Sequence, residues 1–308
     1  MQILTPEISV IICTHNPRPD YLQRVLDALQ AQTLSKERWE LLLVDNGSQE
    51  PLVSAWDLSW HPRARHIREE ELGVTLARMR GIGESTAELL VFVDDDTVLA
   101  PNYLSVGWEI AQSHPFLGAW SGQCHPEFEI PPPRWMARFG VWLTVRRFSG
   151  ERWSNLGIKG EDVPWGAGLW VRRKAALEYN ARVGEDLKRK KLGRIGRELM
   201  ACEDLDLAQT ACDIGLSAGI FSTLELTHLI RKNRLTEDYL LGVIEGHTYS
   251  MTMLEASRGM VPSIPRKGNL RRALGKLRRW LTMSRLKRLS VEAIIRGRQR
   301  AVDELAEG

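Results

Sequence analysis

The stretch LLVFVDDDTVL, Leu89 to Leu99, decides the fold prediction because five apolar residues run directly into three consecutive aspartates. An apolar run of this length, rich in Val and Phe, predicts a buried strand of a parallel sheet that is covered on both faces. The carboxylates then follow the C-terminal end of that strand, which is the edge where open parallel sheets bind ligands. The position alone indicates a candidate site.

The three aspartates need a compensating partner. In an extended chain Asp94 and Asp96 face one side and Asp95 faces the other. Carboxylates that face each other raise one another's pKa unless a cation or hydrogen-bond donors compensate. A hard divalent ion, Mg²⁺ or Mn²⁺, is one such partner, because it takes oxygen ligands and shares them with substrate phosphates. A solvated acidic turn is the alternative interpretation.

Strand and helix signals alternate over the first hundred residues. ISVIICT (8–14), WELLLVDNGS (39–48) and, more weakly, ARHIREEE (64–71) predict strands, and helical patterns lie between them. This order is typical of an α/β fold with a doubly wound, mostly parallel sheet and helices on both faces. The two clearest strands before the aspartates also end in polar residues, at 14–16 and 45–47. These ends are expected to converge on one crevice.

The remainder of the chain is less regular until its last third. Residues 131–133 form a polyproline break, and the Lys/Arg/Gly-rich piece 186–197 predicts a mobile loop. A helix is expected over 201–215, ended by Gly215, followed by a strand over 216–230 and a helix over 236–257.

Composition bounds the class of protein. With 308 residues, 43% hydrophobic and 26% charged, the chain is expected to be a soluble globular protein without a transmembrane helix or secretory signal. Its four scattered cysteines predict free thiols in a reducing cytoplasm. The charge is uneven, because residues 266–308 carry +9 and residues 1–265 carry −6.

Six motifs, in this order, resemble the family 2 glycosyltransferases, which have a GT-A fold. SVIICTHN and LLLVDNGS are similar to the first two strands of the family, and LGVTLARMRGI to the segment before its metal strand. VFVDDDTVLAPNYL is similar to the DxD motif with its following helix. GAGLWVRRKAAL resembles the acceptor-side strand and turn, and CEDLDL the ED motif that carries the catalytic base. The resemblance spans roughly residues 8–239.

The resemblance implies a role for individual residues. Those expected to bind a nucleotide-sugar donor are Thr14, Asp45, Arg78, Asp94 and Asp95. Those expected to hold Mn²⁺ or Mg²⁺ are Asp96, Asp94 and His228. Asp204 is expected to be the general base, and the acceptor is expected to lie against Trp165, Gly166 and Glu203. Two positions depart from the pattern: Met79 stands where many relatives have Asn, and Thr210 where many have Arg.

The implied reaction is an inverting transfer of a sugar, most often from a UDP-sugar in this family, to a hydroxyl of a saccharide or lipid-linked acceptor. A bound metal would stabilise the leaving diphosphate, and Asp204 would accept the acceptor's proton. The chain would then divide into a nucleotide-sugar-binding half (1–105), an acceptor-binding and catalytic-base half of the same domain (106–235), and a helical extension with a basic amphipathic tail (236–308).

Local patterns alone leave structural interpretations open for the same residues. Asp45 also fits turn chemistry in Asp-Asn-Gly, and Arg78 fits a solvated helix face. Asp204 also fits the polar side of an amphipathic helix, and His228 fits a packed histidine. Most tryptophans fill cores, but Trp165 is favoured as an acceptor platform because a flat aromatic face complements a sugar ring.

The basic tail allows three interpretations. Apolar residues recur at helical spacing from Leu270 to Leu281, with Lys and Arg between them. Such a helix fits an anionic membrane surface, contacted through residues 266–300 at the inner face of the membrane. Packing on the acidic body is the second interpretation. Nucleic acid is not expected, because no recognised binding motif accompanies the charge.

Rival functions fit the motifs less well. A sugar-phosphate nucleotidyltransferase is expected to carry a glycine-rich phosphate loop after the first strand, and CTHNPRPDYL contains no glycine. A non-catalytic nucleotide- or sugar-binding module of the same fold would be favoured by loss of the base or of the DxD motif, and both are present. A dinucleotide-dependent oxidoreductase would need GxGxxG after the first strand, which is absent.

Overall fold

One mixed sheet organises the protein. The structure is a computed structural model that describes residues 5–160, 162–196, 198–260 and 283–307. The strands of the N-terminal half are β1 (Ile8–Thr14), β2 (Trp39–Asn46), β3 (Ala64–Glu69) and β4 (Leu89–Asp94). The later strands are β5 (Thr97–Leu99), β6 (Leu117–Phe128), β7 (Glu151–Ser154), β8 (Leu169–Arg172) and β9 (Ser217–Ile230).

Within the described residues the sheet has the order β3-β2-β1-β4-β8-β6-β9-β5, and β7 pairs with β9. Strands β1 to β4 pair in parallel, as do β6 and β9. Strand β8 runs antiparallel to both β4 and β6, and β5 and β7 run antiparallel to β9. Most strands therefore share one direction, which confirms the predicted mostly parallel α/β sheet.

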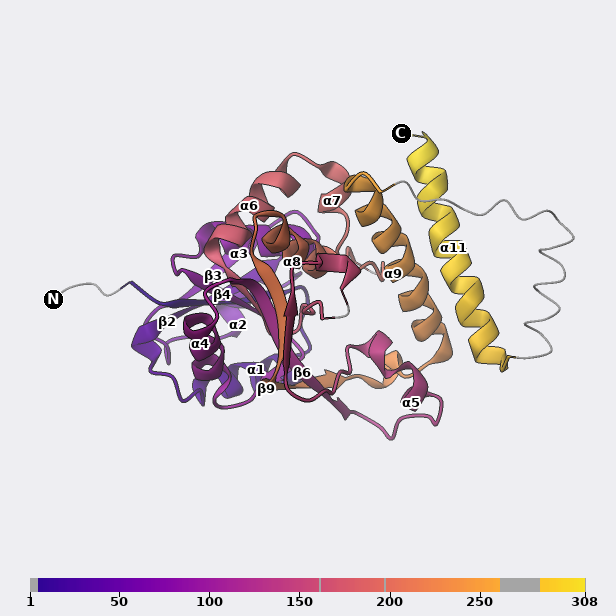
Figure 1. The fold of residues 1–308 in the computed structure, drawn as a ribbon. Coiled ribbons are helices and arrows are strands. Elements are labelled where there is room, and N and C mark those ends of the chain that lie inside the picture. Colours follow the sequence, from indigo (N-terminus) through magenta and orange to yellow (C-terminus); the bar gives the residue numbers. More distant parts are fainter. Residues whose placement is uncertain (1–4, 161, 197, 261–282, 308) are drawn as a thin grey trace, which may run out of the picture.

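Helices cover both faces of the sheet because the strand side chains are apolar on both faces (Figure 1). Ile8, Val10 and Ile12 of β1 pack in one core with helices α1 (Pro19–Gln30) and α4 (Tyr103–Ser113). Ile11 packs in the other core with α3 (Val74–Glu84), α6 (Arg173–Gly184) and α8 (Glu203–Asp213). Because both faces of these strands are buried, their sequences are continuous apolar runs and do not alternate between apolar and polar residues.

Strand register brings the polar strand ends together, as the sequence predicted. Thr14 lies beside Asp45 across β1 and β2, and Cys13 lies beside Asp94 across β1 and β4. Asp95 and Asp96 form a turn between β4 and β5. The alternation predicted for an extended chain therefore stops at Asp94, and it does not apply to the other two aspartates.

Three short helices complete the body: α2 (Leu52–Ala55), α5 (Met136–Phe139) and α7 (Leu187–Lys190). Helix α7 lies in the segment that the sequence predicted as a loop. It forms because the Asp186 carboxylate accepts hydrogen bonds from the backbone N–H groups of Lys188 and Arg189.

In the described part of the C-terminal region, α9 (Glu237–Ser257) and α11 (Arg285–Glu307) lie side by side at one end of the molecule (Figure 1). They approach closely at Gly297, where a Cβ would lie 2.2 Å from the Glu245 carbonyl oxygen. Ala293 and Ala301, one turn to either side, are fully buried. Tyr249 also donates a hydrogen bond to Glu304. Helix α11 therefore packs on the body through α9.

The predicted apolar stripe from Leu270 to Leu281 lies outside the described residues. Among the helices that the structure describes, none combines the length and apolar character needed to cross a bilayer.

Candidate active site

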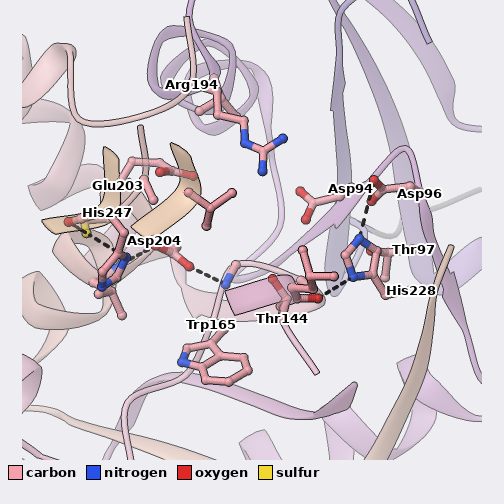
Figure 2. A pocket seen from close by; sticks show the side chains of 18 of the residues that line it. Asp94, Asp96, Thr97, Thr144, Trp165, Arg194, Glu203, Asp204, His228 and His247 are labelled. Atoms are coloured by element: carbon pink, nitrogen blue, oxygen red, sulfur yellow. Dashed lines mark hydrogen bonds and ion pairs between the residues drawn. The ribbon is translucent and has the colours of Figure 1, made fainter. Parts of the chain in front are cut away.

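A cavity of about 1030 Å³ lies at the carboxyl ends of β1 and β4. Figure 2 shows Asp94 and Asp96 on one side of it, and Glu203, Asp204 and His247 on the other. All but one of the site residues predicted from the sequence line this cavity: Thr14, Arg78, Asp94, Asp95, Asp96, Trp165, Gly166, Glu203, Asp204 and His228. The exception is Asp45.

Asp45 holds the turn after β2. Its carboxylate accepts hydrogen bonds from the backbone N–H groups of Ser48 and Leu52 and from the Arg68 guanidinium, at 3.0, 3.1 and 2.6 Å. Burial opposes ionisation, but these donors outweigh it and lower the pKa of Asp45. The turn interpretation of Asp45 thus has a direct structural basis, and its donor contact stays a prediction.

The three consecutive aspartates have three separate partners. The Asp94 carboxylate lies 3.3 Å from the Arg78 guanidinium. The Thr14 hydroxyl donates to the Asp95 carboxylate. Burial and the neighbouring Asp96 carboxylate raise the pKa of Asp95 to about 6. Asp94 therefore lies beside a cation, whereas Asp95 has a neutral donor that does not offset its burial.

Asp96 is the most tightly held of the three. Its Oδ2 lies 2.8 Å from Nη2 of Arg234 and 3.6 Å from Nε2 of His228. Burial would raise the pKa of Asp96, but the Arg234 guanidinium holds it well below its usual range. Arg234 is a residue that sequence reasoning missed.

Arg78 links the aspartates to the ED motif. Its buried guanidinium lies 3.3 Å from Asp94 and 3.2 Å from Glu203, and it sits over the Phe92 ring at 5.3 Å. Burial raises the pKa of Glu203 to about 7, partly offset by Arg78 and reinforced by the Asp204 carboxylate. The structure thus rejects a solvated Arg78.

Asp204 stands in the first turn of α8, where backbone N–H groups hold its carboxylate. The Gly166 N–H donates to Oδ2 at 2.6 Å, and the Leu205 N–H donates to Oδ1 at 2.8 Å. The chain enters α8 through Cys202, whose φ of +81° is uncommon for a residue with a side chain. This entry and the two donors fix the direction of the carboxylate, which faces the cavity (Figure 2).

Trp165 lines the cavity next to Gly166, on the same side as Asp204 (Figure 2). The Arg146 guanidinium lies 3.4 Å from the centre of the Trp165 ring, and burial lowers the pKa of Arg146 to about 10. The Trp165 N–H of the backbone donates to the Ser121 hydroxyl at 3.1 Å. One face of Trp165 is therefore occupied by Arg146, while the residue still lines the cavity.

Helix α9 adds a wall that the sequence analysis did not assign to the site. Tyr239, Val243, His247 and Met251 line the cavity at intervals of four residues. This spacing places them on one face of the helix. The same spacing is visible in the sequence, but only the packing of α9 shows that this face meets the cavity.

Met79 and Thr210, the two positions that depart from the family pattern, each contact a polar side chain from elsewhere in the fold. The Met79 carbonyl oxygen accepts a hydrogen bond from the Asn180 side chain at 3.0 Å. Near Thr210, a guanidinium comes from the end of α9 instead: Arg258 donates to the Thr210 hydroxyl at 3.5 Å and to the Asp206 carboxylate.

Comparison with known proteins identifies the family. The family model described as glycosyl transferase family 2 matches residues 9–178, more than half of the chain. The chain belongs to this family. The match covers the strands that end in Thr14 and Asp94 and extends through Gly166.

Relatives agree with this family membership. Glycosyltransferase AglE of Haloferax volcanii is 34% identical over 94 residues, which are 30% of this chain and 31% of that protein. Validoxylamine A glucosyltransferase of Streptomyces hygroscopicus subsp. limoneus is 28% identical over 185 residues, 54% of this chain and 40% of the relative. The matched stretch thus covers less than half of either relative.

A solved structure matches the fold over nearly the whole chain. The crystal structure of S. aureus TarS 1–349 aligns with a TM-score of 0.50 and 16% identity, covering 98% of this chain and 92% of that one. The predicted GT-A type fold of this family 2 chain is thereby confirmed.

Proposed function

We propose that this chain is an inverting glycosyltransferase that moves a sugar from a nucleotide-diphosphate donor, with UDP as the expected nucleotide, to a hydroxyl of a saccharide or lipid-linked acceptor. The observation that carries the proposal is that Asp204 faces Asp94 and Asp96 across one cavity (Figure 2), which Asp95 also lines. Direct displacement needs a base on one side of the anomeric carbon and a leaving group on the other.

Asp204 is the proposed general base. Its carboxylate is held by two backbone N–H groups, which orient it without supplying a full positive charge. A positioned base of this kind contributes on the order of 10²- to 10⁴-fold to the rate. Glu203 is buried against Arg78 and serves to position the cluster, and Trp165 offers an apolar face near Gly166 to the acceptor.

The proposed donor site lies at the ends of β1 and β4. Thr14 and Asp95, which line the cavity, are joined by a hydrogen bond, and 41% of the Asp94 side chain is accessible. Arg194 and Arg231 also line the cavity. These cationic side chains suit a diphosphate, which carries negative charge that grows as the sugar leaves.

Asp96 and His228 are the residues that fit Mn²⁺ or Mg²⁺. Their Oδ2 and Nε2 atoms lie 3.6 Å apart, and His228 Nδ1 donates to the Leu143 carbonyl oxygen at 3.0 Å, which leaves a lone pair on Nε2. No group of three His, Cys, Asp or Glu side chains in the described part of the chain is arranged around a metal. Such ions commonly take one or two protein ligands and complete their shell with phosphate and water. A bound ion would act as a Lewis acid on the leaving diphosphate.

A membrane contact is the proposed setting for lipid-linked acceptors. Helix α11 packs on α9 with one face, and its other face exposes Ile294 and Ile295 to 40% and 52%. Arginines 296, 298 and 300 follow in the sequence; Arg296 also pairs with Glu245 and Arg300 lies over the Tyr249 ring, both of α9. This combination suits peripheral contact with anionic lipid at the cytoplasmic face of a membrane. Vesicle sedimentation tests it: Ile294→Glu with Ile295→Glu should reduce binding to anionic vesicles, and unchanged binding would contradict the contact.

The central experiment measures transfer and donor binding separately. Titration calorimetry of UDP and GDP, with and without Mn²⁺, identifies the nucleotide, and the anomeric configuration of the product shows whether transfer inverts. Asp204→Asn should bind the donor nucleotide as the parent protein does and lose on the order of 10²- to 10⁴-fold in kcat. Near-normal transfer by Asp204→Asn would contradict its role as the base.

A further inference from the structure

Arg234 lies where a cation would contact Asp96 and His228. It ends the short 3₁₀ helix Lys232–Arg234 that follows β9. Its Nη2 is 2.8 Å from Asp96 Oδ2, and its Nη1 donates to His228 Nε2 at 2.9 Å. Only 16% of the Arg234 side chain is accessible. One guanidinium therefore spans both side chains.

The acceptor character of His228 follows from its other contact. Because Nδ1 donates to the Leu143 carbonyl oxygen, Nε2 carries the lone pair. Arg234 donates to that lone pair and to a carboxylate oxygen of Asp96. A divalent ion would use the same two atoms, at bond lengths of about 2.0–2.2 Å. The guanidinium and the ion cannot occupy both atoms together.

We propose that Arg234 is a resident counter-cation of the Asp96–His228 pair, that a divalent ion displaces it, and that the freed guanidinium then binds the donor diphosphate. This inference rests on the cation site of the proposed function. Arg234 would thus be a positioning and donor-binding residue that couples ion binding to diphosphate binding.

Charge and geometry support both halves of the exchange. An ion that enters alone must break two charge-assisted contacts of Arg234, so its affinity is reduced. When a diphosphate enters with the ion, the displaced guanidinium gains a new anionic partner in the same cavity, where planar guanidinium groups bind phosphate oxygens in pairs. The arrangement therefore favours the ion together with the diphosphate over the ion alone.

The test is a titration with Mn²⁺, with and without UDP, in which electron paramagnetic resonance measures the concentration of the free ion. Arg234→Ala should bind Mn²⁺ alone on the order of tenfold more tightly than the parent protein, since two contacts no longer compete. It should bind UDP in the presence of Mn²⁺ on the order of tenfold more weakly. A residue that only stabilises the fold would not move the two affinities in opposite directions.

Two further variants complete the design. Arg152→Ala is the matched control, because Arg152 lines the same cavity but pairs with Asp162 at 3.4 Å. Its affinity for Mn²⁺ alone should equal that of the parent. Arg234→Lys keeps the charge but loses the paired N–H groups, so it should bind Mn²⁺ alone with intermediate affinity. If Arg234→Ala does not fold, the Lys variant decides the question.

The outcomes separate the two proposals. Affinity for Mn²⁺ alone that is equal or weaker in the Arg234 variants would overturn the counter-cation role while leaving the cation site intact. Absence of Mn²⁺ binding in every protein, with UDP present, would overturn the cation site and the counter-cation role with it. Sugar transfer by the parent protein would still be open to the separate test at Asp204.

Discussion

Replacing Gly166 by Ala should displace the proposed base by a small and calculable amount. A Cβ at this position would lie 2.9 Å from Arg78 Nη2, 3.1 Å from Asp204 Oδ2 and 3.2 Å from Asp204 Cβ. Each distance is a few tenths of an ångström shorter than ordinary van der Waals contact. Because Gly166 also donates its N–H to Asp204, the carboxylate cannot move without lengthening that hydrogen bond.

The size of the effect follows from that displacement. A misplacement of about 1 Å costs roughly 10²-fold in rate, so a shift of a few tenths of an ångström should lower kcat roughly tenfold, or about 1.4 kcal/mol in the activation barrier. Overpacking should also cost about 1–3 kcal/mol of stability. The assay is steady-state transfer well below the unfolding temperature, with the KM for the donor expected to remain close to that of the parent.

Gly83→Ala is the matched control for Gly166→Ala. Gly83 is exposed in α3, and a Cβ there would meet nothing within 4 Å. Alanine in place of glycine in the last turn of α3 should stabilise the protein by at most about 1 kcal/mol and leave kcat unchanged. If Gly166→Ala retains the kcat of the parent while remaining folded, the position of Asp204 does not limit the reaction, and the reasoning from these contacts fails.

Three further predictions concern stability, pH and the acceptor. Asp206→Ala should lose about 3–5 kcal/mol in urea unfolding because it leaves Arg189 and Arg258 without their buried carboxylate; a loss below about 1 kcal/mol would contradict this. The pKa of Glu203 is about 7 in the folded protein against an ordinary value of 4.5, so the folded protein binds the Glu203 proton more tightly than the unfolded chain does. The stability that this proton contributes is therefore full below pH 4.5 and is lost as the pH rises through 7. The free energy of unfolding in urea should therefore fall less between pH 5 and pH 8 for Glu203→Gln than for the parent protein. An equal fall in both proteins would refute this role of Glu203. Trp165→Ala should raise the acceptor KM by roughly tenfold and leave the donor KM unchanged, because an aromatic ring contributes about 1 kcal/mol beyond its area; an equal rise in both constants would argue against an acceptor platform.

The sequence predicted the sheet and most of the cavity lining because these depend on short-range patterns. Apolar runs gave strands β1, β2 and β4, and parallel pairing then brings the carboxyl ends of those strands together wherever the exact bounds fall. The general direction of Asp204 and Glu203 likewise follows from their place in the first turn of α8. No knowledge of distant contacts is needed for these inferences.

The partners of individual charges depend on register, which the sequence pattern does not reveal. Asp45 lies directly opposite Arg68 across β2 and β3, and this pairing, together with the turn donors, occupies its carboxylate. Thr97 lies opposite His228 across β5 and β9, and this pairing brings His228 to Asp96. Arg234 follows six residues after His228 and reaches the same carboxylate. A shift of one residue in either strand pair would change these partners without changing the apolar pattern.

Five carboxylates line the cavity, and their partners differ. Asp95 accepts a hydrogen bond from the Thr14 hydroxyl. Asp94 and Glu203 share the buried guanidinium of Arg78, and Asp96 has Arg234. Asp204 instead accepts hydrogen bonds from backbone N–H groups, which are neutral dipoles. The two backbone N–H groups hold the Asp204 carboxylate in place and direct it toward the cavity. This orientation, and the place of Asp204 across the cavity from Asp94 and Asp96 (Figure 2), support the proposal that Asp204 accepts the proton. Both observations are independent of its place in the ED motif.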